Sequence, residues 1–106
     1  MAPLLLTLYK FEWRRALRLA SRNDQSAIKA LQNLWHDSVH CALCDRQIAH
    51  GAVHTQPLPE PDTAKILLLS LCAGCWSMSP STRLSQCIGL LKKSHLQGRQ
   101  EAYLEF

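Results

Sequence analysis

Apolar residues near the start of the chain recur at helical spacing. Steps of three and four residues connect Leu6, Tyr9, Trp13, Leu17 and Ala20, which places them on one face of a helix. The pattern predicts an amphipathic helix over residues 4–20. Arginines occupy several positions outside this stripe, so the opposite face is expected to be basic.

A second apolar stripe follows a polar break at residues 21–24. Asn23 or Asp24 is a suitable N-cap, because its side chain can accept a hydrogen bond from the first free amides. The stripe predicts a helix over about residues 25–37, with an apolar face of Ala27, Ile28, Leu31, Leu34 and Trp35. A short loop between two such helices favours an antiparallel hairpin, in which we expect Trp13 and Trp35 to be the packing anchors.

The middle of the chain alternates short apolar runs with turn residues. Residues 39–48 predict a strand, a knuckle turn and a returning strand, and residues 49–55 continue as strand and turn around Gly51. Residues 56–63 contain three prolines, which predicts an irregular, semi-rigid loop. The apolar run at residues 66–71 then predicts a buried strand.

The last clear element is a helix over residues 80–95. Ser79 is a suitable N-cap and Pro80 fits the first turn, where no amide is needed. We expect a buried stripe of Leu84, Cys87, Ile88 and Leu91. In this position Cys87 is predicted to be a packed core thiol.

Four of the five cysteines form two pairs with two residues between the thiols: Cys41 with Cys44, and Cys72 with Cys75. This spacing lets both sulfurs of a pair turn toward one point, and two pairs supply the four thiolates of a structural zinc site. We therefore expect one structural Zn²⁺. Two disulfides, or a redox pair, are the alternatives, and His36, His40 and His50 flank the first pair as alternative ligands.

Composition favours a small globular protein. The chain has 106 residues, of which 47% are hydrophobic and 19% charged, so it can bury a core of limited size that a metal ion would help to stabilise. We find no signal peptide and no stretch of about 20 apolar residues, and expect a cytoplasmic protein without a membrane partner. In such a compartment paired cysteines are more often metal ligands than disulfides.

The segment from Cys41 to Cys75 resembles the HNH endonuclease family. The resemblance is carried by the two cysteine pairs, by His54 followed by Pro57-Leu58, and by the apolar run before the second pair; it covers about a third of the chain. It implies a treble-clef ββα fold around zinc, with His54 as the general base of a nuclease. The other catalytic positions depart from the family: Val53 replaces an acid, residues 66–69 contain no asparagine, and Trp76 follows the second pair. A catalytic divalent ion needs oxygen and imidazole ligands, so we expect the scaffold without catalytic residues.

These observations together predict a small α+β protein. We expect a helical hairpin at residues 1–38, a zinc-stabilised treble-clef or zinc-ribbon-like ββα module at 39–97, and a C-terminal tail at 98–106.

The distribution of basic residues along the chain indicates the class of partner that the protein binds. The net charge is only +4, but basic residues are clustered, which is compatible with phosphate binding. The candidate nucleic-acid contacts are Arg14, Arg15, Arg18, Arg46, Lys92 and Lys93. We expect a non-catalytic module that binds DNA or RNA, as a subunit of a larger protein or nucleoprotein complex. The alternatives are a protein-binding adaptor or inhibitor of the kind carried by mobile elements, with a homodimer through residues 4–20 as a variant, and a metal-dependent HNH nuclease.

Overall fold

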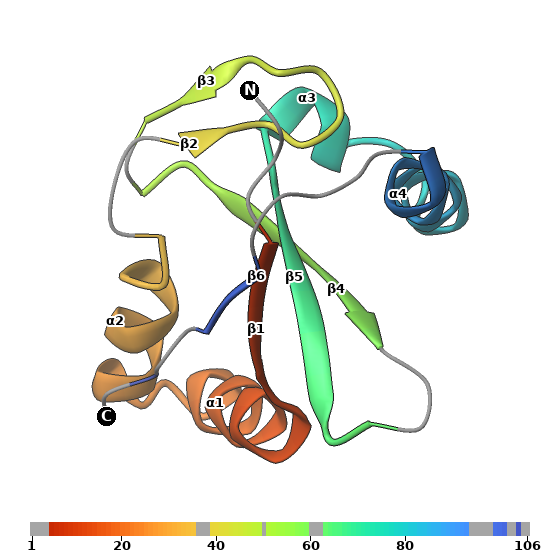
Figure 1. Ribbon diagram of the computed structural model, residues 1–106. Coiled ribbons are helices and arrows are strands. Elements are labelled where there is room, and N and C mark those ends of the chain that lie inside the picture. The colour runs from red at the N-terminus through yellow and green to blue at the C-terminus, as the bar shows by residue number, and fades with distance from the viewer. Residues whose placement is uncertain are drawn as a thin grey trace.

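The computed structural model describes residues 5–35, 39–49, 51–59, 63–93, 99–101 and 104. Its elements are, in chain order, β1 (Leu5–Tyr9), α1 (Lys10–Ser21), α2 (Gln25–Gln32), β2 (Val39–His40), β3 (Gln47–Ile48), β4 (His54–Pro59), β5 (Lys65–Leu71), α3 (Ala73–Trp76), α4 (Pro80–Lys93) and β6 (Arg99–Glu101). One sheet has the strand order β4-β5-β1-β6, and β2 pairs with β3 in a separate ribbon (Figure 1). The protein is thus a small α+β fold.

Strand β5 is the centre of the sheet. It pairs antiparallel with β4 on one side and with β1 on the other, where Leu6 lies opposite Leu68. Successive side chains of a strand point to opposite faces. Leu67, Leu69 and Leu71 therefore enter one buried cluster, and Ile66 and Leu68 enter another. This burial on both faces explains the continuous apolar run and confirms the predicted buried strand.

Helices α1 and α2 cover one face of the sheet (Figure 1). The buried cluster on this side joins the sheet to the two helices through Leu6, Leu8, Trp13, Leu34, Trp35, Ile66 and Leu68. The indole Nε1–H of Trp35 donates to Thr55 Oγ1 at 2.9 Å. Both tryptophans are buried, so their predicted role as packing anchors is confirmed.

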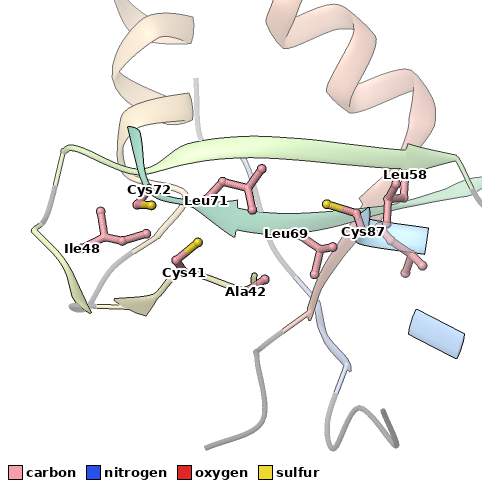
Figure 2. Close-up of a cluster of buried hydrophobic side chains, with 9 residues drawn as sticks. Cys41, Ala42, Ile48, Leu58, Leu69, Leu71, Cys72 and Cys87 are labelled. Atoms are coloured by element: carbon pink, nitrogen blue, oxygen red, sulfur yellow. The ribbon is translucent and has the colours of Figure 1, made fainter. Parts of the chain in front are cut away.

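The cysteine-containing turns and α4 pack on the other face. Figure 2 shows this second cluster, in which Cys41, Cys72 and Cys87 lie among the leucines of β4 and β5. Cys87 is fully buried, which confirms the prediction of a packed core thiol.

The prediction of one helix over residues 4–20 is wrong at its start. Leu5–Tyr9 is strand β1, which pairs antiparallel with β5 and parallel with β6. Leu6 and Leu8 also alternate as a strand requires, and β5 offers them both backbone partners and an apolar face. The helix begins only at Lys10. Two members of the predicted stripe, Tyr9 and Leu17, are 47% and 44% exposed.

The predicted irregular loop at residues 56–63 is also wrong in its first half. Residues up to Pro59 belong to strand β4, which lies at the edge of the sheet. Prolines are tolerated on an edge strand when the missing amide would face away from the partner. Pro57 and Pro59 are two residues apart, so both nitrogens point in the same direction and neither disturbs the pairing with β5.

The remaining helices differ from prediction at their ends and in one face. Helix α2 ends at Gln32, earlier than expected. Helix α4 continues to Lys93, and its predicted end at residue 95 lies outside the described residues. Leu84 and Ile88 were expected to be buried but are 37% and 40% exposed. Helix α4 lies beside the edge strand β4 and contacts the core through Cys87, Leu90 and Leu91, so only a narrow line of the helix is covered.

Residues from all three predicted domains contribute to one sheet. Strand β1 comes from the predicted hairpin, β4 and β5 from the predicted zinc module, and β6 from the predicted tail. The division of the chain into domains stays a prediction. None of the helices in the described ranges combines the length and the apolar character needed to cross a bilayer.

Candidate metal centre

The first cysteine pair lies in the tight turn between β2 and β3. The amide of Cys41 donates to the Arg46 carbonyl at 2.8 Å, and the amide of Asp45 donates to the Cys41 carbonyl at 2.9 Å. Asp45 has a φ of 61°, a left-handed conformation that Asp adopts more readily than most residues. The predicted strand, knuckle turn and returning strand are confirmed.

Two hydrogen bonds attach this turn to the central strand. The amide of Ala42 donates to the Ser70 carbonyl at 2.9 Å, and Ser70 Oγ donates to the His40 carbonyl at 2.9 Å. Both bonds fix the turn against the end of β5, immediately before the second cysteine pair. The two cysteine pairs, which are far apart in the sequence, are thereby brought close together.

The second pair lies at the start of helix α3. Cys72 is the N-cap residue, and its sulfur accepts a hydrogen bond from the Cys75 amide at 3.5 Å. A backbone amide of the second pair thus donates to one of its own sulfurs. Strand β5 therefore delivers Cys72 directly to the turn that carries Cys41 and Cys44.

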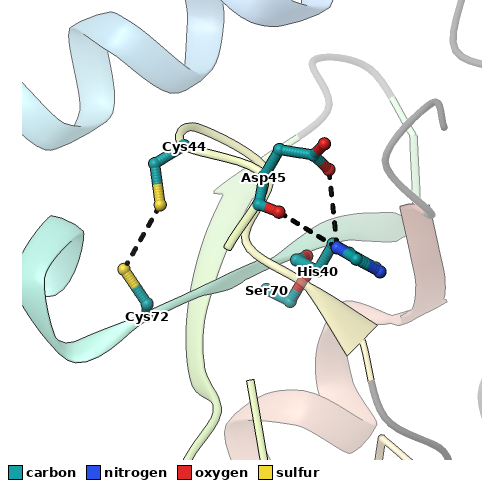
Figure 3. Close-up of polar contacts among 5 residues, drawn as sticks. All are labelled: His40, Cys44, Asp45, Ser70 and Cys72. Carbon is teal, nitrogen blue, oxygen red and sulfur yellow. Dashed lines mark hydrogen bonds and ion pairs between the residues drawn. The ribbon is translucent and has the colours of Figure 1, made fainter. Parts of the chain in front are cut away.

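The four sulfurs have the spacing that a tetrahedral ion requires. The Sγ atoms of Cys41, Cys44, Cys72 and Cys75 all lie within 4.8 Å of one another. Figure 3 shows Cys44 and Cys72, whose sulfurs are 3.6 Å apart. Zn–S bonds of about 2.3 Å in a tetrahedron would separate neighbouring sulfurs by about 3.8 Å. All five cysteines of the chain are free thiols, and a disulfide would need sulfurs about 2.05 Å apart.

This donor set fits zinc by its chemistry as well as by its size. Four thiolates in a closed tetrahedron are typical of structural zinc sites, whereas a catalytic site keeps one position open for water. Cys41 and Cys72 are buried, Cys75 is half-buried and Cys44 is exposed. A bound ion would connect the β2–β3 turn, the end of β5 and the start of α3.

The thiols differ in how easily they lose a proton. The hydrogen bond from the Cys75 amide is the main reason that the pKa of Cys72 falls from 9.0 to about 6. Burial, followed by the neighbouring sulfurs, raises the pKa of Cys75. The Arg46 amide lowers the pKa of Cys44, but burial and the sulfurs of Cys41 and Cys72 outweigh it, so this pKa is raised as well. Among these three thiols, Cys72 is therefore the one that loses its proton most easily.

The histidines beside the first pair are not part of this cluster as far as the structure describes them. The Nδ1 of His40 donates to the Asp45 carbonyl at 3.0 Å and lies 3.6 Å from the Asp45 carboxylate (Figure 3). His36 and His50 lie outside the described residues.

His54 lies at the start of β4 and is half-buried. Its ring stacks on Trp76, with centroids 5.3 Å apart and planes at 12°. The guanidinium of Arg83 also lies over the Trp76 ring, 3.8 Å from its centroid. A role for His54 in catalysis stays a prediction.

Arg83 holds the α3–α4 connection to the edge strand. Its Nε donates to Gln56 Oε1 at 2.7 Å, and Nη1 donates to the carbonyls of Trp76 at 2.8 Å and Met78 at 3.3 Å. Arg83 was not among the site residues predicted from the sequence. Arg83 is in the first turns of α4, and its partner Gln56 is on a strand that is distant in sequence. The residues around Arg83 therefore gave no sign of these hydrogen bonds.

The predicted nucleic-acid contacts are distributed over different parts of the molecule. Arg14, Arg15 and Arg18 are exposed on α1, and Arg46 is exposed directly before β3. The β2–β3 ribbon lies at the opposite end of the sheet from α1 (Figure 1). The side chains of Lys92 and Lys93 lie outside the described part of the chain.

No protein-family model matches the chain, and neither the curated proteins nor the solved structures include a significant match. The resemblance to HNH endonucleases therefore stays a prediction from the motif.

Proposed function

We propose that this protein is a zinc-stabilised treble-clef module that binds nucleic acid through the arginines of α1. The treble-clef assignment is supported by the order of the elements around the cysteines. A knuckle turn with two ligands is followed by the β4–β5 hairpin, and the hairpin leads into a helix whose first turn supplies two more ligands. The HNH resemblance implies the same order.

The exposed arginine face of α1 carries the nucleic-acid proposal. Trp13 and Ala16 are the buried residues of this helix, so the opposite face is directed to solvent. Arg14 and Arg18 lie on that outer face and form no ion pair in the described part of the chain. Arginines one turn apart can each contact a phosphate, which provides affinity without sequence preference.

The test uses two variants with the same net charge. Arg14→Gln combined with Arg18→Gln removes two positive charges from α1, and Lys29→Glu changes the net charge equally at an exposed position on α2. Binding to labelled oligonucleotides is measured by fluorescence anisotropy over a salt series. We expect the arginine variant to bind more weakly, with a log–log salt slope shallower by about 1.5, and Lys29→Glu to change affinity far less.

Equal losses in the two variants would show that only net charge matters and would remove the α1 site. Absence of binding to every oligonucleotide at low salt would contradict the nucleic-acid function as a whole.

A protein-binding adaptor is the second candidate, favoured by the outer face of α4. Leu84 and Ile88 are exposed there, and they line a shallow hollow of about 470 Å³ together with Ser81, Ser85 and Gly89. Light scattering of the wild-type protein and of Ile88→Glu tests self-association through this face. A concentration-dependent dimer that the substitution dissociates would support it, and a strict monomer would remove the homodimer.

A further inference from the structure

The corner between β1 and α1 presents two aromatic rings to solvent. Phe11 is 65% exposed and Tyr9 is 47% exposed. Their ring centroids are 5.9 Å apart with planes at 32°. Single exposed apolar residues are common on protein surfaces, but two neighbouring rings beside a basic helix face form a specific combination.

The two rings are held on a fixed backbone. The amide of Lys10, which lies between them in sequence, donates to the Ala64 carbonyl at 2.8 Å, and its Nζ donates to the Thr63 carbonyl at 2.7 Å. Tyr9 is the last residue of β1, where it pairs with Lys65. The Nζ of Lys65 lies 5.5 Å from the centroid of the Tyr9 ring. Both sides of the corner are thus anchored to the β4–β5 hairpin.

Phe11 also lies on the arginine face of α1. At about 100° per residue, Phe11, Arg14, Arg15 and Arg18 fall within about 60° of one line along the helix. Trp13 and Ala16, the buried residues of α1, lie on the other side. The exposed ring of Phe11 therefore lies at the N-terminal end of a row of arginines on the solvent-facing side of the helix.

We propose that Phe11 and Tyr9 stack on unpaired bases, so that α1 binds single-stranded nucleic acid. This inference rests on the proposed nucleic-acid function and specifies its substrate. In a duplex the base faces are covered by their neighbours, whereas a single strand can offer a base to an aromatic ring while its phosphates follow adjacent arginines. The shared chemistry is an unpaired base next to a phosphate, in either RNA or DNA.

The experiment compares three substitutions at Phe11, which is exposed and outside both buried clusters. Phe11→Ala removes the ring, Phe11→Leu keeps an apolar side chain without a ring, and Phe11→Trp supplies a larger ring. Anisotropy is measured with single-stranded RNA, single-stranded DNA and a duplex of the same sequence, after zinc content and circular dichroism have been matched to wild type.

We expect tighter binding to at least one of the single strands than to the duplex. The single strand that binds more tightly shows whether the ligand is RNA or DNA. Phe11→Ala and Phe11→Leu should both weaken single-strand binding by about 5- to 150-fold, the range expected for one lost base–aromatic stack. Phe11→Trp should retain it. The salt slope should stay unchanged in all three variants, because no phosphate contact is lost.

Two results would overturn the stacking proposal while leaving the phosphate-binding function intact. One is duplex binding as tight as single-strand binding, and the other is wild-type affinity in Phe11→Leu. Failure of the wild-type protein to bind any of the three nucleic acids would overturn both.

Discussion

The four cysteines of the metal centre lie in two kinds of local environment. Cys41 and Cys72 are part of the hydrophobic core, whereas Cys44 and Cys75 lie at or near the surface. Cys41 and Cys72 would therefore connect a bound ion to the packed interior. Their pattern was readable from the sequence, because ligand spacing within each pair is a local property.

Substitutions should show that the four clustered cysteines bind zinc and that the fifth cysteine does not. Cys72→Ser is expected to abolish stoichiometric zinc binding, since one of four thiolates is lost from a closed site. Cys87→Ala removes a buried sulfur from the same core cluster and should lower stability while retaining one zinc per chain. Metal analysis of the purified variants measures both. Loss of zinc in Cys87→Ala but not in Cys72→Ser would contradict the assignment.

Zinc affinity should increase with pH. The pKa values of Cys44 and Cys75 are raised above 9.0 and that of Cys72 is about 6, so near neutral pH zinc must displace protons from the first two thiols. We expect affinity to rise about a hundredfold per pH unit between about pH 6 and 8, and more steeply below pH 6, where Cys72 is also protonated. Competition with a chromophoric chelator measures this. A pH-independent affinity would show that the ligands are not thiols.

Arg83 should contribute strongly to stability without affecting the metal. Arg83→Met leaves Gln56 Oε1 and two backbone carbonyls without their donor, and Gln56 is buried. We expect the free energy of unfolding to fall by about 2 kcal/mol, measured by urea denaturation at saturating zinc. Arg83→Lys keeps the charge but not the planar fork and should lose less. An unchanged unfolding midpoint in Arg83→Met would contradict this role.

At the scale of elements, the helices that begin with a clear cap were the most predictable. Of the two N-caps that the sequence offered for α2, Asn23 and Asp24, it is Asp24 whose side chain accepts from the Ala27 amide, at 3.0 Å. Ser79 Oγ accepts from the Thr82 amide at 3.4 Å at the start of α4. A cap and an apolar period are both local features, so no knowledge of the fold was needed.

The cap of α2 allows a quantitative test. Asp24→Ala is expected to lower the free energy of unfolding by about 1 kcal/mol, because the first turn loses its acceptor. Asp24→Asn should stay close to wild type, since asparagine is an equally good N-cap. Thermal or urea unfolding of both variants measures the difference, and equal losses would indicate that the charge rather than the hydrogen bond matters.

Strands that depend on distant partners were the least predictable. Strand β1 pairs with β5 and β6, both of which lie far along the chain, and its leucines satisfy helical and strand periods alike. Strand β4 was obscured by its prolines, which are acceptable only because it lies at an edge. The position of Leu84 and Ile88 on the open side of α4 likewise depends on which strand the helix packs against.

At the scale of the whole molecule, the metal centre connects segments that the chain order separates. The β2–β3 turn, the end of β5 and the start of α3 meet at the four sulfurs, and the same cluster includes leucines of β4 and β5. With one small core on each face of the sheet, the protein depends on this connection. Metal binding energy should therefore act as folding energy.

Removal of zinc should unfold the cysteine side first. With chelator, we expect a lower thermal midpoint and faster hydrogen exchange at residues 39–49 and 70–77. The face covered by α1 and α2 should lose less protection, because its cluster of Trp13, Leu34 and Trp35 contains no metal ligand. Identical exchange and melting after confirmed zinc removal would contradict a structural role for the ion.

X-ray absorption at the zinc edge of the purified protein tests the metal centre most directly. We expect one zinc per chain surrounded by four sulfur atoms at about 2.3 Å. A shell containing nitrogen or oxygen would show that a histidine, carboxylate or water replaces one of the four cysteines. Absence of bound zinc in protein purified under reducing conditions would contradict the metal centre on which the proposed module rests.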